Sequence, residues 1–124
     1  MHPGLTKTFL AGAAIARRRF IKFDVVDGQV LQGAAATDSL FGVSDMSADC
    51  VNGDRVEVRL SNVAEVDIGG TIPRGSLVTS DANGKAVAAA PAAGSNVRVM
   101  GIALASYVAG DIGDVFLTQG SMQG

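Results

Sequence analysis

The side chains that carry out nucleophilic catalysis or bind transition metals are scarce in this chain. It holds one histidine, His2, and one cysteine, Cys50. A structural zinc site needs about four Cys or His ligands, and a Ser-His-Asp or Cys-His site needs a histidine beside its nucleophile. Because His2 is expected in a mobile N-terminus, neither site can be assembled, and Cys50 is predicted to be a small buried or half-buried apolar residue.

The acidic residues follow no ligand or catalytic spacing. Four oxygen-bearing side chains crowd one predicted loop: Asp45, Asp49, Asn52 and Asp54. Their spacing misses the alternate positions of an EF-hand calcium loop, and Gly84-Lys85 lacks the upstream glycine of a phosphate-binding motif. Glu57 and Glu65 could meet in space, but no aromatic sugar platform lies near them in the sequence. We therefore predict no enzyme, no metal site and no cofactor.

Positive charge is concentrated at the start of the chain. Residues 1–22 hold five basic and no acidic side chains, whereas the remaining residues hold five basic and twelve acidic ones, a net charge of −7. Apolar residues at near-helical spacing predict that residues 1–19 form a basic arm, loose or weakly helical, that orders on contact with a partner. The residues predicted to contact an acidic partner surface are Arg17, Arg18, Arg19 and Lys22. The alternative is that this segment is a solvated linker.

From Phe20 onward the hydrophobic period is two, which indicates strands. Residues 55–60 place three apolar side chains on one face and three charged ones on the other, as in a half-buried antiparallel strand. The predicted inward residues are Val56, Val58 and Leu60, and the predicted outward residues are Arg55, Glu57 and Arg59. Asp27-Gly28 and Asn83-Gly84 predict the turns of two hairpins, because glycine adopts positive φ angles readily.

Two segments repeat one order of features. Phe41-Gly42-Val43-Ser44 precedes Gly53-Asp54 and a strand, and Met100-Gly101-Ile102-Ala103 precedes Gly110-Asp111 and the apolar residues 115–117. We interpret Gly42 and Gly101 as places where a strand passes close to another backbone, and each Gly-Asp pair as a turn. The predicted fold class is mainly β: a single compact β-barrel or β-sandwich with pseudo-symmetric halves, short antiparallel hairpins and the N-terminal arm.

Length and composition limit the class of protein. The chain has 124 residues and a net charge of −2, with 48% hydrophobic and 18% charged residues, so one domain over residues 20–124 is expected beside the arm. No apolar run approaches the roughly 18 residues of a membrane span. The acidic body and its few aromatic residues argue against a nucleic-acid-binding face. We expect neither a membrane nor a nucleic acid as partner, although binding of nucleic acid by the arm alone stays open.

An ordered series of segments resembles the small capsid cement, or head decoration, proteins of tailed bacteriophages. The series is FGV (41–43), GDRVEV (53–58), GGTIPRGSLV (69–78), DANGKAV (81–87), GIALA (101–105), AGD (109–111) and VFL (115–117). The resemblance implies a β-rich fold, no catalysis, and attachment to the outside of a head whose major capsid protein has already assembled. Threefold clusters are common in this family, which implies a trimer of neighbouring copies.

The resemblance implies a structural function. A cement protein that binds the assembled lattice better than its free subunits stabilises the shell by mass action. The expected partners are the major capsid protein and neighbouring copies of the chain, and the expected location is the capsid exterior, reached from the host cytoplasm during assembly. The alternatives are another virion component, such as a fibre, tail or adaptor β protein, and a small ligand-binding β-barrel.

Overall fold

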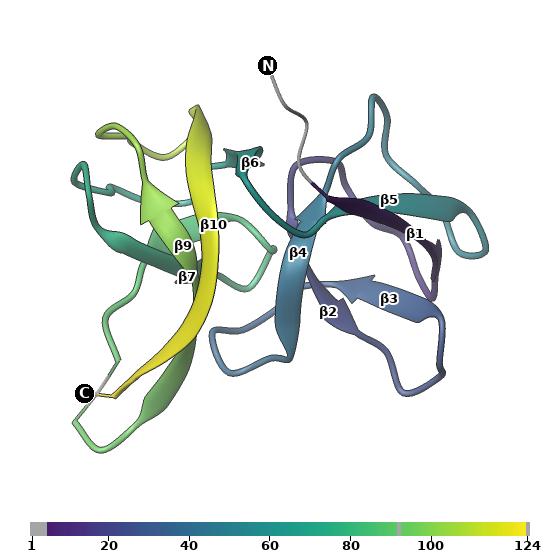
Figure 1. Cartoon of the computed structure of the whole chain (residues 1–124), viewed down its shortest axis with the longest axis horizontal. Helices are drawn as coiled ribbons and strands as arrows, with labels where there is room; N and C mark the ends of the chain where they lie inside the picture. Colours follow the sequence, from purple (N-terminus) through teal and green to yellow (C-terminus); the bar gives the residue numbers. More distant parts are fainter. Residues whose placement is uncertain (1–4, 92, 124) are drawn as a thin grey trace.

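The computed structural model describes residues 5–91 and 93–123, and this part of the chain folds into ten β-strands without a helix. The strands are β1 Thr6–Ala11, β2 Phe20–Phe23, β3 Gln29–Gln32, β4 Leu40–Ser44, β5 Arg55–Arg59, β6 Val63–Asp67, β7 Leu77–Ser80, β8 Ala86–Ala88, β9 Asn96–Ala103 and β10 Ile112–Gln123. Strands β1 to β5 form a closed barrel, the barrel unit, and β6 to β10 form a five-stranded sheet, the sheet unit. The two units lie side by side, and β4 is on the side of the barrel nearest the sheet (Figure 1). The mainly β prediction is confirmed.

The sheet unit repeats the barrel unit strand for strand. The sheet order is β6-β10-β9-β7-β8, and the barrel follows the corresponding order β1-β5-β4-β2-β3. Parallel pairing of β1 with β3 closes the barrel, while the sheet unit keeps only the parallel bridge between Ile68 and Ala86 at that place. The two units are therefore one closed and one nearly open version of the same five-stranded motif.

Loop contacts confirm the repeat and fix its offset. An antiparallel bridge joins Ile15 to Cys50 in the barrel unit, and Ile72 and Tyr107, each 57 positions further along, form the same bridge in the sheet unit. Both Gly-Asp turns are closed alike: the Val51 N–H donates to Asp54 Oδ2 at 2.9 Å, and the Val108 N–H donates to Asp111 Oδ2 at 2.9 Å. The predicted pseudo-symmetric halves are present.

The repeated glycines lie where strands approach closely, as predicted. A Cβ atom on Gly42 would lie 2.6 Å from the carbonyl oxygen of Arg59, closer than real Cβ contacts come. A Cβ atom on Gly101 would overlap the carbonyl oxygen of Phe116. Both predicted hairpins also form, with β2 paired to β3 and β7 paired to β8, and their turn glycines have positive φ.

Strand β5 matches its predicted alternation except at its end. Val56 and Val58 are fully buried and Arg55 and Glu57 are exposed. Arg59, predicted to face outward, is mostly buried: its side chain is 13% exposed and its Nη2 lies 2.6 Å from Asp45 Oδ2. The reason is its position facing the sheet unit, where it lines a hollow together with residues of β6 and β10.

The expectation of a loose or weakly helical arm is wrong for residues 6–19. Strand β1 is part of the barrel wall, antiparallel to β5 over Thr6–Leu10 and parallel to β3 at its end. Phe9 and Ala11 point inward with period two, and the rings of Phe9 and Phe41 meet edge to face at 5.3 Å between centroids. An isolated helix of this length is marginal in water, so burial in the barrel decides the conformation. His2 lies outside the described residues.

One apolar cluster joins the two units. It fills the interior of the sheet unit and also contains Phe20, Leu40 and Val43 of the barrel unit. A second cluster fills the barrel alone. Because the first core is shared, the two units form one compact body. Separating the units would expose apolar surface that is buried between them.

Candidate functional site

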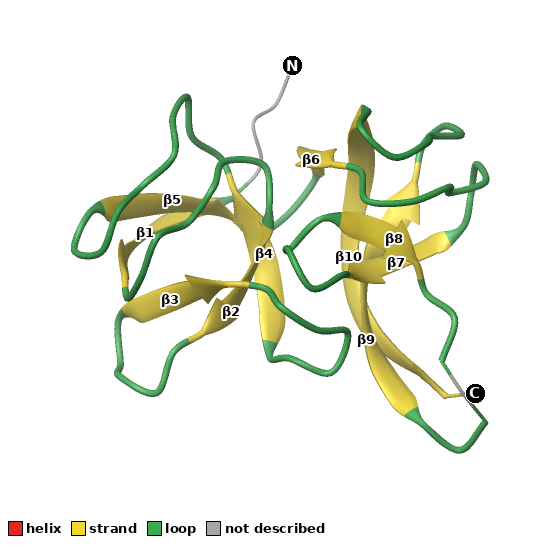
Figure 2. Cartoon of the chain, turned by 180° about the vertical axis from the view of Figure 1, so that it is seen from behind, coloured by secondary structure: helices red, strands yellow, loops and turns green. Residues whose placement is uncertain are grey.

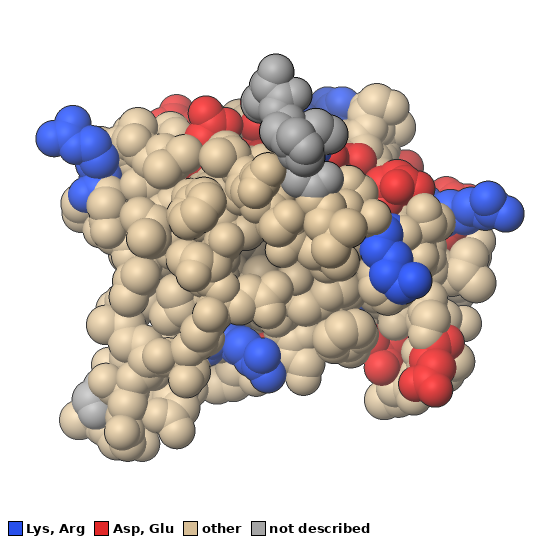
Figure 3. Space-filling model, in the orientation of Figure 1, with Lys and Arg blue, Asp and Glu red and all other residues tan. Residues whose placement is uncertain are grey.

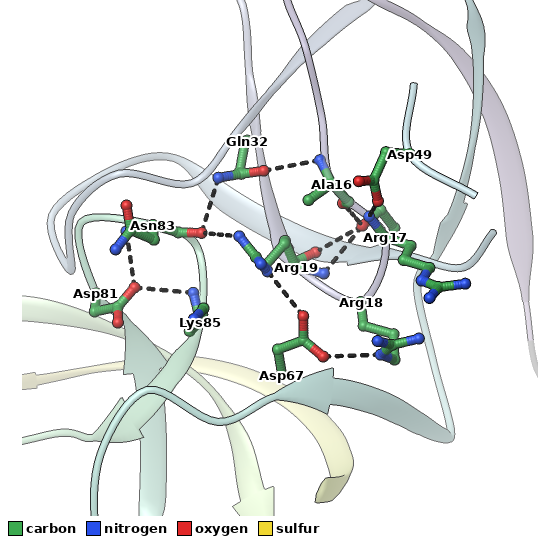
Figure 4. A network of polar contacts seen from close by, with 11 residues as sticks. Ala16, Arg17, Arg18, Arg19, Gln32, Asp49, Asp67, Asp81, Asn83 and Lys85 are labelled. Atoms are coloured by element: carbon green, nitrogen blue, oxygen red, sulfur yellow. Dashed lines mark hydrogen bonds and ion pairs between the residues drawn. The ribbon is translucent and has the colours of Figure 1, made fainter. Parts of the chain in front are cut away.

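Two of the four predicted contact residues meet at the junction between the units. Arg18 Nε lies 2.8 Å from Asp67 Oδ1, and Arg19 Nε lies 3.1 Å from Asp67 Oδ2 (Figure 4). Asp67 ends β6, so one carboxylate of the sheet unit binds two guanidinium groups of the barrel unit. These arginines therefore serve an internal contact.

The other two predicted residues lie apart from this pair. Lys22 Nζ is 3.3 Å from Asp38 Oδ2 within the barrel unit. Arg17 is exposed, and its Nη1 donates to the carbonyl oxygen of Ser47 at 2.8 Å. The structure thus separates the basic residues into an internal pair and two outlying side chains.

The turn between β7 and β8 is held against the barrel unit beside this pair. The Asn83 carbonyl oxygen accepts from Arg19 Nη1 at 3.0 Å and from Gln32 Nε2 at 2.8 Å. The Asp81 carboxylate holds the turn from within by accepting the N–H groups of Asn83 and Lys85. Figure 2 shows this turn from behind, reaching from the sheet unit towards the barrel. Polar contacts thus fix the units around their shared core.

Asp67 is the titratable group of this junction. Burial raises its pKa, but the hydrogen bonds and positive charges of Arg18 and Arg19 outweigh burial and hold the pKa below the ordinary value of 3.8. A carboxyl whose pKa is lowered by folding stabilises the fold above its unfolded pKa, and this contribution is lost as pH falls through the folded pKa.

We expect acid to remove this contribution below about pH 4. The free energy of unfolding of the unmodified chain should exceed that of Asp67→Asn by a constant amount above about pH 5, and the difference should shrink as the pH falls further. Urea melts of both proteins between pH 3 and pH 7 measure it. If the difference in the free energy of unfolding does not change with pH, the negative charge of Asp67 is not the source of its stabilising contact with Arg18 and Arg19.

An apolar row crosses the outer face of the sheet unit. Register partners place Val63 of β6 opposite Phe116 of β10, Phe116 opposite Ile102 of β9, and Ile102 opposite Leu77 of β7. Phe116 is 45% exposed, Leu77 39% and Val63 37%. We call these four residues the sheet row. Figure 3 shows that charged side chains are sparse on the side of the molecule that carries β9 and β10.

Two carboxylates lie beside the sheet row. Glu65 and Asp114 are register partners, both are exposed, and neither forms an ion pair with a described residue. They line a hollow of about 310 Å³ with Val63, Asp45 and Arg59. Like charges directly opposite each other on a sheet are unfavourable, so a basic group on a binding partner would be stabilising here.

A second exposed apolar surface lies on the barrel unit, beside the turn between β2 and β3. It consists of Phe23, Val25 and Val26, which we call the barrel patch, and their exposed fractions are 52%, 98% and 51%. Leu10 is also exposed near this turn, but it lies on the outer face of the barrel sheet, whereas Phe23 shares the inward face with its register partner Val30. The ring of Phe23 stacks on that of Phe41 at 3.9 Å between centroids, so this patch rests on the barrel core.

The sequence interpretation missed both surfaces. The available signal for the sheet row was that residues 112–117 carry apolar side chains on both faces of one strand, Phe116 outward and Val115 and Leu117 inward. A strand that is apolar on both faces is buried on both sides or exposes one face for a partner. The sequence alone does not separate these cases.

The remaining groups that could carry chemistry are the Cys50 thiol and the carboxylates outside the junction. Cys50 is buried, and burial, followed by the charges of Asp54 and Asp49, raises the pKa of its thiol, so the protonated form prevails at neutral pH. Within residues 5–91 and 93–123 no three His, Cys, Asp or Glu side chains lie close enough together to hold a metal ion. The same part of the chain has no helix of a length and hydrophobicity suited to crossing a membrane.

Comparison with known proteins identifies the family of the chain and a solved structure with a similar fold. A family model described as phage cement protein matches residues 1–117. Among solved structures, the N base of the head fiber gp8.5 of bacteriophage phi29 has a TM-score of 0.70 and 19% sequence identity, over 92% of this chain and 93% of that chain. At this identity the likeness is one of fold. No curated protein matches the chain.

Proposed function

The chain belongs to the phage cement protein family, and from this premise we propose that it binds the exterior of an assembled phage head and stabilises the capsid lattice. Family membership makes it a structural protein of the bacteriophage virion and implies binding to a capsid. The proposal adds three points: the chain binds the outer side of the shell, it binds after the shell has assembled, and its binding stabilises the lattice.

The observation that carries the proposal is the amount of apolar surface left exposed on a body with few charges. The sheet row and the barrel patch together expose seven apolar side chains, each on a strand or turn anchored to a buried core. Burying apolar surface contributes about 25 cal/mol per Å². A protein that covers subunit junctions with such surfaces binds the assembled shell better than free subunits and so favours assembly.

The proposal is tested with heads assembled without this chain from the major capsid protein of the same phage. The purified chain is added over a range of concentrations, and bound chain is measured by sedimentation of the heads. We expect saturable binding and a higher temperature for disruption of the shell. The chain spun without heads is the control, and failure to co-sediment would reject the proposal.

For the basic cluster we propose a contact that is limited to Arg17. Arg18 and Arg19 bind Asp67 and Lys22 lies beside Asp38, whereas Arg17 is exposed and binds only backbone and a loop carboxylate. A single exposed ion pair contributes roughly 0.2 to 1 kcal/mol and is screened by salt. Arg17→Ser in the same binding assay should therefore weaken head binding slightly at low salt and have no effect at high salt.

The likeness to a head fiber base supports a second candidate function, the base of a fibre on the head. The two candidates differ in stoichiometry. A cement protein should occupy sites over the whole lattice, at hundreds of copies per particle, whereas a fibre base should be present only at the number of copies that the fibres of the head require. Quantitative gel analysis of purified particles against the major capsid protein separates these cases.

A further inference from the structure

Most residues that are identical at equivalent positions of the two units have a structural role in both. Glycines recur at close approaches and at positive φ, aspartates recur as turn caps, and apolar residues recur in the two cores. Such pairs include Gly42 and Gly101, Gly53 and Gly110, Asp54 and Asp111, Ile15 and Ile72, and Val58 and Val115. These identities maintain the fold and need no partner.

Two further identities concern side chains that are exposed in both units. Val51 is 64% exposed, and Val108, 57 positions further along, is 55% exposed. Arg17 and Arg74, also 57 positions apart, are both exposed, and neither forms an ion pair with a described residue. Exposed side chains contribute little to stability, so a contact outside the chain explains their recurrence better than the fold does. We call Arg17 and Val51 the barrel loop site, and Arg74 and Val108 the sheet loop site.

The arginine and the valine of each site lie on two loops that the fold holds together. The loop after β1 bridges the loop after β4, and the loop after β6 bridges the loop after β9 in the same way. The Arg17 N–H donates to Asp49 Oδ1 and the Arg74 N–H donates to Ser106 Oγ, each at 3.0 Å. The two loop sites therefore have the same backbone frame.

Each loop site combines a positive charge with apolar surface. At the sheet loop site, Pro73 and Val108 line a hollow of about 260 Å³, and Arg74 follows Pro73 directly. At the barrel loop site, Ala16 takes the place of Pro73, and the Asp49 carboxylate lowers the local positive charge. We therefore expect apolar contact to supply most of the affinity, with a carboxylate of the partner beside each guanidinium group.

The two loop sites are separate surfaces on one rigid body. In Figure 1 the β9–β10 loop lies at the upper left and the β4–β5 loop at the upper right, on the other side of the junction between the units. The shared core and the ion pairs of Asp67 fix the two units against each other. Two separate surfaces of the same kind fit two copies of one partner that are held at a fixed spacing.

We propose that the two loop sites bind two neighbouring subunits of the major capsid protein, so that one chain bridges them. The repetition assigns the partner, because a lattice of identical subunits presents one surface again and again at a regular spacing. The inference deepens the proposed function and rests on it for the identity of the partner. The sheet row and the barrel patch are not part of either loop site.

Bridging accounts for a preference for the assembled shell over free subunits. A single site that binds one subunit binds it equally well before and after assembly. When both sites are engaged, the second binding step is intramolecular, and the affinity exceeds that of one site by roughly 10²- to 10⁴-fold. Only the lattice holds two subunits at the required spacing, so this gain favours the assembled state.

A charge introduced at each loop site in turn tests the bridge. Val51→Glu disrupts the barrel loop site, Val108→Glu disrupts the sheet loop site, and the double variant disrupts both. Ala90→Glu, at an exposed residue of the loop between β8 and β9, is the matched control for the added charge. Each protein is titrated onto heads assembled without this chain and, separately, onto unassembled capsid subunits that are followed by sedimentation velocity. Thermal melts check that each variant is folded.

On heads, we expect each single variant to lose about 100-fold or more in affinity, because either substitution leaves only one working site. Ala90→Glu should bind like the unmodified chain. With an excess of unassembled subunits, the unmodified chain should carry two subunits, each single variant one, and the double variant none.

Two results would overturn the inference: a single variant that binds heads as tightly as the unmodified chain, or an unmodified chain that carries fewer than two unassembled subunits at the highest subunit concentration. If the unmodified chain still binds heads in either case, the proposed function survives without this inference. If the unmodified chain carries two unassembled subunits but does not bind heads, the proposed function fails and the inference stands.

Discussion

Gly101→Ala is expected to lower the free energy of unfolding by about 3 kcal/mol, a large effect for the addition of one carbon. The new Cβ atom would overlap the Phe116 carbonyl oxygen and would lie 2.8 Å from Val115 Cγ1. Because the first of these is backbone, no side-chain rotation relieves the clash, and β9 and β10 must separate locally. Urea melts followed by circular dichroism measure the change.

Gly120→Ala is the matched control for this variant. Gly120 belongs to the same strand pair as Gly101, yet a Cβ atom there would meet no heavy atom within 4 Å. We expect its stability to change by less than about 0.5 kcal/mol. If the two substitutions lower the stability equally, the loss at Gly101 comes from the backbone freedom of glycine and not from the close approach of β9 to β10.

Phe20→Ala is expected to lower the free energy of unfolding by about 3 to 5 kcal/mol. Phe20 starts β2 of the barrel unit, but its fully buried ring belongs to the core of the sheet unit. Its removal therefore leaves a cavity at the point where the two units are joined. Differential scanning calorimetry and urea melts report both the loss and whether the chain still unfolds in one transition.

Phe23→Ala, at the other end of β2, separates this effect from a general loss of aromatic surface. Phe23 is 52% exposed and packs on Phe41 outside the shared core. We expect a loss of about 1 kcal/mol for it, and no change in the coupling of the two units. A loss from Phe20→Ala as small as this would contradict the view that the two units share one core through that residue.

Local patterns in the sequence were sufficient for much of the fold. The alternation at Val56 and Val58, the turn glycines of both hairpins, and the close approach at Gly42 and Gly101 each depend on residues near one another in the chain or on the missing Cβ of glycine. The N-terminal segment was misread because Leu5, Phe9 and Ala13 fit a helical spacing while Phe9 and Ala11 fit a strand spacing. Only pairing with β5, far along the chain, decides between the two.

The candidate site was less accessible, for two physical reasons. The charge count identified the basic residues but not their partner, because Asp67 lies 49 positions from Arg18 and meets it only through tertiary packing. Phe20 and Leu77 occupy equivalent places in the two units, 57 positions apart, and a sequence cannot show that Phe20 is covered while Leu77 is exposed. That difference arises from the position of each unit in a tandem pair.

The central claim, a cement protein on the outside of the shell, is tested most directly by an electron cryomicroscopy reconstruction of purified heads that carry this chain. We predict density for the two-unit body on the outer surface, repeated over the lattice, above junctions between subunits of the major capsid protein. Heads that show no such density outside the shell, or that show it only at the tail vertex, would contradict the account.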